Sequence, residues 1–313
     1  SDLSPSWEGL GVGQSPSWEG LGVGQSPSWE GLGVGLLGDR FRISYVPSTK
    51  ILDLCQQRQQ ATPATLGIVE NTTGDLPYTP LECEWVAQTW QVAATNRLEG
   101  AAATPDTYFQ LLERVQALLS SHHATSRADN PLASYLLLAN GQQVTLRDLL
   151  SPLWRFPQLL EVFLSCCETG LSFAAYRDEQ GALNRDALDE PLSIGTGFLI
   201  AGARSVISSH WAVSDLATSL FSREYHQARK AGHDRLSALH TARTVLRTRT
   251  QQEWLNQLED DYEQVSDDRK EIRTQKRTQI AKIRGWLEKN FAATDIPFQD
   301  QRYWGAFHCL GLP

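Results

Sequence analysis

The fold is decided by the stretch LLEVFLSCCETG, residues 159–170. An apolar run short enough for a strand leads directly into two cysteines and then into a polar turn that contains glycine. Residues 117–123 and 205–211 follow the same plan, since each is a short apolar run that ends in reactive or polar residues. Helical stretches separate these runs. Strands that alternate with helices predict a mainly parallel sheet with helices on both faces.

Further elements fit this plan. Residues 41–46 alternate between apolar and polar side chains, which predicts a strand, and residues 66–69 predict a second, buried strand. Residues 80–91 and 105–115 have the character of helices. Ser214 precedes a helical apolar pattern and is a candidate N-cap, since its hydroxyl can accept a hydrogen bond from the first turn.

A helical insertion is predicted for residues 251–290. Apolar side chains recur there at near-heptad spacing, and charged residues fill the remaining positions. The apolar positions are Trp254, Leu258, Tyr262, Val265, Ile272, Ile280, Ile283 and Leu287. This pattern predicts a helical hairpin or one long projecting helix. Its exposed face is either a solvated surface or a docking surface for a regulatory partner.

The N-terminal region carries an internal repeat. Residues 4–35 hold three near-identical 11-residue units, each with a Ser-Pro pair, a tryptophan and several glycines. Glycine and proline at this density are incompatible with a stable helix. The repeats are either a flexible linker or short strands that pair at a sheet edge. We therefore divide the chain into residues 1–37, which hold the repeats, and residues 38–313, a single larger domain.

The composition is that of a globular protein. The chain has 313 residues and a net charge of −8 without a strong basic stripe, which argues against nucleic acid as a partner and fits a protein or peptide with basic residues. No apolar run reaches the roughly 20 residues that a membrane-spanning helix needs, so no membrane is expected as a partner, and the first residues lack the features of a signal peptide. Because the sequence contains no Met, we expect a processed product or a part of a longer protein.

Five cysteines are scattered along the chain, and none of them forms a C-x-x-C pair. The odd number and the irregular spacing argue against a disulfide framework or a zinc site. Free thiols are typical of a reducing compartment, so the sequence predicts a cytoplasmic protein. No metal or other cofactor is expected.

Two of the predicted strands deliver reactive side chains to one edge of the sheet. His122 and His123 end one apolar run, and Cys166 and Cys167 end the next. The carboxyl ends of parallel strands are where open α/β sheets bind ligands. An imidazole there can take the proton of a thiol and so activate the sulfur as a nucleophile. Neighbouring residues of a strand face opposite sides, so only one histidine and one cysteine can face such a site.

The motifs around these residues resemble those of CHAT-domain proteins, caspase-like peptidases that are often joined to TPR repeats and are related to separase. Residues 164–170, LSCCETG, are similar to the family's L-S-A-C-E-T-G. His123-Ala124 with residues 130–138, NPLASYLLL, is similar to its H-G and N-P-L-x-S-x-L-x-L. Residues 198–215 and 303–311 resemble its W-x-V-x-D stretch and its closing strand. The match runs in register over about residues 38–313, and the cyanobacterial members of heterocyst differentiation are the most similar in character.

The resemblance implies a caspase-like three-layer α/β sandwich with a mostly parallel central sheet and a Cys-His dyad. Its register makes His123 the base and Cys167 the nucleophile, while Cys166, which stands where the family has Ala, should pack inward. The backbone N–H groups of Ala124 and Cys167 would form the oxyanion hole. Ala124 stands where the family has glycine, so the hole requires that this position does not need a positive φ. Leu119 stands where the family usually has another histidine in this strand, so the contact that this histidine would make beside the dyad is absent.

The resemblance also implies a substrate side. The segment Ser209-His210-Trp211 leaves a predicted strand at the same edge, where its backbone can pair with an extended peptide and Trp211 can form a wall. Asp215 matches the acid of W-x-V-x-D, which in separase-like enzymes receives arginine, although an acid there also favours the start of a helix. Glu168 and Glu190 are further candidate acids.

These features predict a cysteine endopeptidase that cleaves a regulatory protein after Arg or Lys through a thioacyl intermediate. Two alternatives remain open. The same fold could act as a catalytically silent scaffold that binds partner proteins, with the repeats and residues 251–290 as docking surfaces. Cys166 and Cys167 could also form a redox pair, although a disulfide between adjacent cysteines is strained.

Overall fold

The computed structural model describes residues 37–127, 130–166, 192–264 and 270–313. The chain divides into two compact units, residues 1–41 and 42–313. In the first unit the described residues form one short helix, α1 (Leu37–Arg40), and the three 11-residue repeats lie outside the described residues. The second unit contains both sheets and the other described helices.

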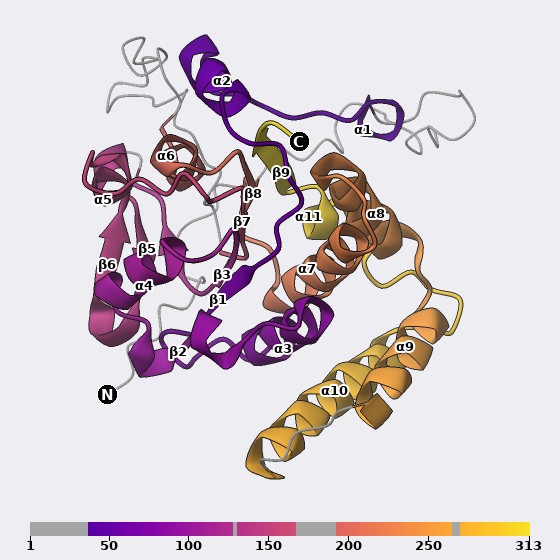
Figure 1. The fold of residues 1–313 in the computed structure, drawn as a ribbon. Coiled ribbons are helices and arrows are strands. Elements are labelled where there is room, and N and C mark those ends of the chain that lie inside the picture. Colours follow the sequence, from indigo (N-terminus) through magenta and orange to yellow (C-terminus); the bar gives the residue numbers. More distant parts are fainter. Residues whose placement is uncertain (1–36, 128–129, 167–191, 265–269) are drawn as a thin grey trace, which may run out of the picture. The chain divides into compact units, whose positions relative to one another are not determined.

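A six-stranded sheet in the order β2-β1-β3-β7-β8-β9 forms the centre of the second unit (Figure 1). Its strands are β1 (Leu66–Glu70), β2 (Arg97–Glu99), β3 (Ala117–Ser121), β7 (Glu161–Leu164), β8 (Ser205–Ser209) and β9 (Phe307–Gly311). Neighbouring strands run parallel except β9, which lies antiparallel to β8 at one edge. The mostly parallel sheet that the sequence predicts is therefore confirmed.

The central strands are apolar because both of their faces are covered. In β3, Leu118 packs into one hydrophobic cluster and Leu119 into the other, and Val162 and Phe163 of β7 divide in the same way. All four side chains are buried. Burial of each contributes about 2 kcal/mol to stability, and a strand that is buried on both faces has a nearly continuous apolar sequence.

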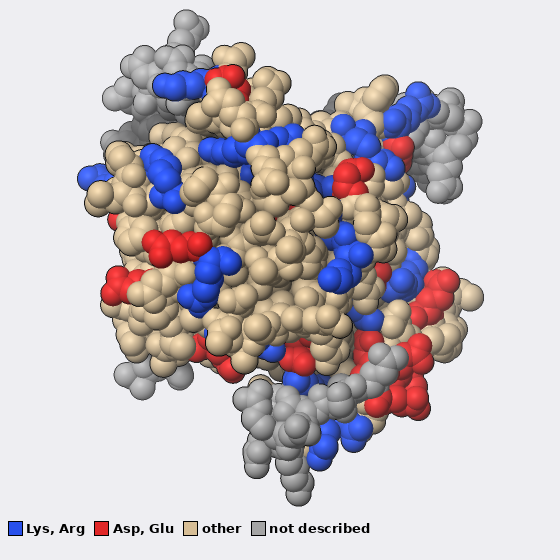
Figure 2. Space-filling view, viewed as in Figure 1, with Lys and Arg blue, Asp and Glu red and all other residues tan. Residues whose placement is uncertain are grey.

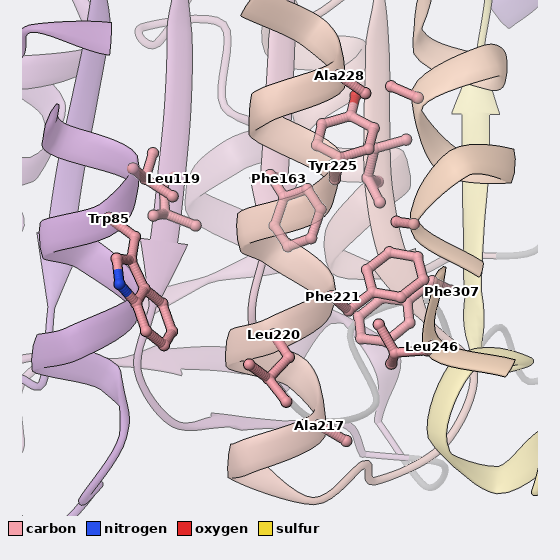
Figure 3. Packing of buried hydrophobic residues seen from close by; sticks show 14 of the residues in the cluster. Trp85, Leu119, Phe163, Ala217, Leu220, Phe221, Tyr225, Ala228, Leu246 and Phe307 are labelled. Carbon is pink, nitrogen blue, oxygen red and sulfur yellow. The ribbon is translucent and has the colours of Figure 1, made fainter. Parts of the chain in front are cut away.

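Helices cover both faces of the sheet (Figure 1). One face carries α3 (Thr79–Trp90), α7 (Asp215–Lys230), α8 (Arg235–Thr248) and α11 (Gln301–Trp304). The other carries α2 (Thr49–Gln56), α4 (Pro105–Leu112), α5 (Leu146–Leu150), α6 (Ile194–Ala201) and a small antiparallel sheet of β4 (Ala124–Thr125), β5 (Tyr135–Leu137) and β6 (Gln143–Thr145). In Figure 3, Phe163 points toward α7, and the rings of Phe221 and Phe307 stack with their centroids 3.9 Å apart. The predicted three-layer arrangement is confirmed.

The insertion forms the predicted helical hairpin, made of α9 (Gln251–Gln264) and α10 (Lys270–Asn290). Five of its heptad-like apolar positions are fully buried, namely Trp254, Leu258, Ile280, Ile283 and Leu287. Val265 and the side chain of Ile272 lie outside the described residues. In the view of Figure 2, basic and acidic side chains are interspersed, and acidic ones gather over α9. No helix in the described part of the chain is both long and apolar enough to cross a membrane.

One local prediction was wrong, and another was confirmed only in part. In the second unit, the predicted strand around residue 45 is reduced to a single bridge, in which Tyr45 pairs with Leu310 of β9. Pro47 follows almost at once and α2 begins two residues later, so the segment is too short to extend the ladder. Ser214 is the N-cap residue of α7, as predicted, but its side chain forms no capping hydrogen bond.

A buried carboxylate fixes the start of β7. Glu161 accepts hydrogen bonds from the Tyr225 hydroxyl at 2.6 Å, from Arg229 Nη2 at 2.7 Å and from Arg235 Nε at 3.0 Å. All four side chains are buried. Burial alone would raise the pKa of Glu161, but the two guanidinium charges and these hydrogen bonds lower it to about 2. The ionised carboxylate therefore holds β7 to α7 and to the start of α8.

Replacing Glu161 by Gln should leave two buried guanidinium groups without a counter-charge, which should lower the free energy of unfolding at pH 7 by about 3–5 kcal/mol. In the wild type, the lowered pKa of Glu161 means that its contribution is present above pH 4.5 and is lost as the pH falls toward about 2. In the Gln variant, the free energy of unfolding should not show this decrease at low pH. Urea unfolding at a series of pH values measures both effects.

The matched control is Glu259→Gln, because Glu259 pairs with Arg284 where both side chains are substantially exposed. This change should cost less than about 1 kcal/mol. An equally small effect of Glu161→Gln would contradict the role assigned to the buried carboxylate.

Candidate active site

A pocket of about 70 Å³ lies at the carboxyl ends of β3, β7 and β8. Residues from these strand ends, from the loop before α3, from β9 and from the start of α7 line it; they include Leu76, His123, Ser165, Ser209, Asp215 and Phe307. This is the edge at which open parallel sheets bind ligands. Three predicted site residues, His123, Ser209 and Asp215, therefore line the same pocket. Other lining residues, such as Leu76 and Phe307, were not predicted from the sequence.

His123 is the accessible imidazole at this edge, with a side chain that is 40% exposed. Its neighbour His122 is buried on the opposite side of the strand, where its Nε2 lies 2.7 Å from Ser120 Oγ. Burial lowers the pKa of His122 to about 4, so this ring is neutral at physiological pH. Both histidines border the pocket with Asp215, but His122 is buried, and only His123 of the two has a substantially exposed side chain.

Asp75 orients the His123 ring, and sequence reasoning missed it. His123 Nε2 lies 3.0 Å from Asp75 Oδ1. The hydroxyl of Thr73 also donates to this carboxylate and, together with His123, lowers the pKa of Asp75. When Nε2–H donates to the carboxylate, the neutral ring carries its lone pair on Nδ1, which is then the nitrogen that can accept a proton. Asp75 lies in the turn that follows β1, 48 positions before His123, and no sequence motif marks it.

The cysteine side of the predicted dyad is described only up to Cys166. Cys166 is buried, as predicted, and its Sγ donates to the carbonyl oxygen of Ser120 at 3.1 Å, although the residue also borders the pocket. The N–H of Ser165 donates to the same carbonyl at 2.9 Å, which ties the end of β7 to β3. Cys167, and with it the predicted acids Glu168 and Glu190, lie outside the described residues.

Ala124 has an ordinary backbone conformation. It is not among the non-glycine residues with positive φ in the described part of the chain. It faces Leu136 of β5, and the Leu137 N–H donates to the His123 carbonyl at 2.9 Å. This bond pattern makes Ala124 and Leu136 a pair that is not hydrogen-bonded, so the Ala124 N–H is directed away from β5. Alanine in place of glycine is therefore compatible with a donor at this position.

Asp215 lies in the pocket wall as the first residue of α7. Its Oδ2 accepts a hydrogen bond from the Tyr78 N–H at 2.9 Å, which joins the start of α7 to the start of α3. Burial raises the pKa of Asp215, whereas the Tyr78 N–H and the positive charge of His123 lower it. No group of three His, Cys, Asp or Glu side chains that could hold a metal ion occurs within the described ranges.

The sequence predicts that the end of β8 pairs with a substrate peptide. β8 lies between β7 and β9, and the His210 N–H donates to the Ala306 carbonyl at 3.0 Å. Ser209 is buried, and its Oγ donates to the Cys166 carbonyl at 3.1 Å. The His210 ring stacks on His308 with the centroids 3.7 Å apart. Toward β9 the backbone edge at Ser209 is therefore occupied, whereas the register between β7 and β8 ends at Ile207, so pairing of Ser209 with a peptide stays a prediction.

Trp211 lies outside the set of residues that line the pocket. Its indole N–H donates to the Arg302 carbonyl at 3.2 Å, and the side chain is 37% exposed. Among the described residues, the apolar walls come instead from Leu76, Val213 and Phe307. A role for Trp211 in substrate binding would have to involve the exposed surface beside the pocket.

The CHAT domain family matches residues 28–312. The chain belongs to this family. Among solved structures, the CHAT chain is similar to the Arg specific cysteine proteinase gingipain R, with 9% identity and a TM-score of 0.41, over 62% of this chain and 46% of that one. It is also similar to the complex of Porphyromonas gingivalis RgpB pro- and mature domains, with 10% identity and a TM-score of 0.39, over 61% and 47% of the two chains. The CHAT chain thus spans less than half of either chain, and no curated protein matches it.

Asp75→Ala should release the His123 ring of the CHAT domain. In the wild type, the hydrogen bond to the carboxylate should slow the exchange of the Nε2–H proton with water, so its NMR signal should be observed at low temperature. The signal should broaden or disappear in Asp75→Ala, and His123→Gln assigns it.

Asp53→Ala is the control, because Asp53 lies on α2 and bonds Gln57. This change should leave the His123 signal as it is. A signal that is equally sharp in Asp75→Ala would show that Asp75 does not orient the ring.

Proposed function

We propose that this CHAT-domain protein is a cysteine endopeptidase that cleaves a regulatory protein after Arg or Lys. The observation that carries the proposal is the accessible His123 ring, which is hydrogen-bonded to Asp75 in a pocket at the carboxyl edge of a parallel sheet. β7, the strand next to β3, leads in the sequence to Cys167, the residue that the family motif marks as the nucleophile. A thiol and an imidazole at adjacent strand ends are the two groups that such a reaction requires.

The proposed reaction proceeds in two steps. His123 Nδ1 takes the proton of the Cys167 thiol, and the sulfur attacks the scissile carbonyl, whose oxygen becomes an oxyanion held by the N–H groups of Ala124 and Cys167. The C–N bond then breaks, and the imidazolium gives its proton to the leaving amine, so that a thioacyl enzyme remains. In the second step His123 removes a proton from water, the resulting hydroxide attacks the thioester, and the thiol is restored as the acid product leaves.

Asp215 is the proposed acid for the basic side chain before the scissile bond. One of its oxygens is held by the Tyr78 N–H, which fixes the carboxylate in the pocket wall. A guanidinium group forms strong charge-assisted hydrogen bonds with such a carboxylate. The apolar stem of Arg or Lys can pack against Val213 and Phe307.

The α9–α10 hairpin is the proposed site of a regulatory partner. Gln279 Nε2 donates to the Pro77 carbonyl at 2.7 Å, and Lys276 pairs with Glu84 at 3.0 Å. Pro77 belongs to the loop that carries Asp75 and Leu76. A partner that moves α10 would therefore act on the loop that orients His123.

The proposal is tested with peptides that contain a single Arg or Lys. The wild type, with each candidate activator added, should cleave after that residue. Cys167→Ala should lower kcat/KM at least about a thousandfold, and His123→Ala at least about a hundredfold. Mass spectrometry of the products locates the cleaved bond.

Asp215→Asn tests the specificity. It keeps an acceptor for the Tyr78 N–H but removes the charge, so it should raise KM for Arg peptides while cleavage after an uncharged residue changes little. Equal inertness of the wild type and Cys167→Ala under every condition would contradict the enzyme and favour the catalytically silent scaffold.

A further inference from the structure

A second buried carboxyl group lies beneath the pocket. Glu82 of α3 is 1% exposed, and its Oε2 accepts a hydrogen bond from Ser121 Oγ at 2.7 Å. Thr79, one turn earlier on α3, places its Oγ1 3.2 Å from the same Ser121 hydroxyl. The end of β3 is thereby attached to α3 through polar side chains in an otherwise apolar layer.

Two more hydroxyls face this carboxyl group. Ser165 at the end of β7 and Ser222 of α7 lie close enough to act on the ionisation of Glu82. Yet Glu82 Oε1, Ser165 Oγ and Ser222 Oγ are all buried and form no hydrogen bond of good geometry within the described residues. A buried polar atom without a partner costs about 1–3 kcal/mol. A proton on the carboxyl group supplies a donor that can satisfy one of these hydroxyl oxygens.

The surroundings favour the protonated acid. The pKa of Glu82 is raised to about 7, chiefly by burial. The negative charge of Asp215 on α7 acts in the same direction, and the three serine hydroxyls act against it. On α3 the adjacent Cys83 thiol is also buried. Burial, Glu70 and Glu82 raise the pKa of that thiol, so it stays protonated.

The cluster connects the two strands that matter for the proposed reaction. Ser121 is two residues before His123, and Ser165 is two residues before Cys167 in the sequence. Glu82 on α3 therefore lies against the end of β3, with Ser165 at the end of β7 and Ser222 of α7 nearby, and Ser165 itself lines the pocket.

We propose that Glu82 is a positioning residue whose protonated carboxyl group ties the ends of β3 and β7 to α3 and α7 and so holds His123 in place. In its protonated form it accepts from Ser121 and donates to Ser165 or Ser222. In its ionised form it can only accept, and it brings a second negative charge close to Asp215. The catalytic part of this inference rests on the proposed peptidase function, but the structural part does not.

The structural part is tested by the pH dependence of stability. The folded-state pKa of Glu82 lies above its ordinary value of 4.5, so the native state retains a proton that the unfolded chain releases. Its stabilising contribution is complete below pH 4.5 and is lost as the pH rises through about 7. Glu82→Gln keeps a donor and an acceptor but cannot ionise, so urea unfolding should show no such decline. The exposed Glu113→Gln is the control, and a decline equal to the wild type in Glu82→Gln would overturn the proposal.

The positioning part is read from His123. Glu82→Ala should broaden the His123 Nε2–H signal and lower kcat about tenfold with little change in KM, and Glu82→Gln should restore both toward the wild type. If Glu82→Ala does not fold, Ser165→Ala should give a smaller effect in the same direction. A sharp His123 signal with unchanged kcat in either alanine variant would overturn the positioning role. If the wild type cleaves nothing, the proposed function has failed. The His123 signal and the pH dependence of stability then still test whether Glu82 positions the strand ends.

Discussion

A buried, ionised carboxylate is stable only if groups of the protein supply the opposite charge and the hydrogen bonds that water would give. At Glu161 this requirement fixes the helices against the sheet. Two guanidinium groups and one hydroxyl surround it at 2.6–3.0 Å. Because Arg229 lies on α7 and Arg235 on α8, these helices can take only one position relative to β7. The direction of α7 then carries Asp215 to the opposite end of the sheet, where its carboxylate meets the Tyr78 N–H.

At that opposite end the chemistry of the sheet changes. The strand interiors are apolar, but their carboxyl ends carry hydroxyls, imidazoles and a thiol within a few residues of one another. The Ser120 carbonyl accepts hydrogen bonds from both Ser165 and Cys166, so the ends of β3 and β7 keep a fixed register. Glu161 and Glu82 therefore act at opposite ends of the sheet: Glu161 is an ionised group at the start of β7, and Glu82, whose pKa is raised to about 7, accepts a hydrogen bond at the end of β3.

Much of this architecture could be predicted from the sequence because it depends on local patterns. The apolar runs around Leu118 and Val162 predict buried parallel strands, and the near-heptad spacing of Trp254 and Leu258 predicts the hairpin. The opposite environments of His122 and His123 follow from strand alternation. A cytoplasmic location and a cyanobacterial origin stay predictions. Asp75 and Glu82 could not be predicted, since each acts through a residue that is distant in sequence, at 48 and 39 positions. The antiparallel pairing of β9 with β8 could not be predicted either, because the two strands are distant in sequence.

The central claim is that Cys167 is a nucleophile activated by His123. It is tested most directly by an Arg-containing peptide with a thiol-reactive electrophile in place of the scissile bond, followed by mass spectrometry of the labelled protein. The account predicts one adduct, on Cys167, that is absent in Cys167→Ala and much slower to form in His123→Ala. Cys55, Cys83, Cys166 and Cys309 are buried and serve as internal controls. Labelling that is absent, or that spreads over these thiols at a rate independent of His123, would contradict it.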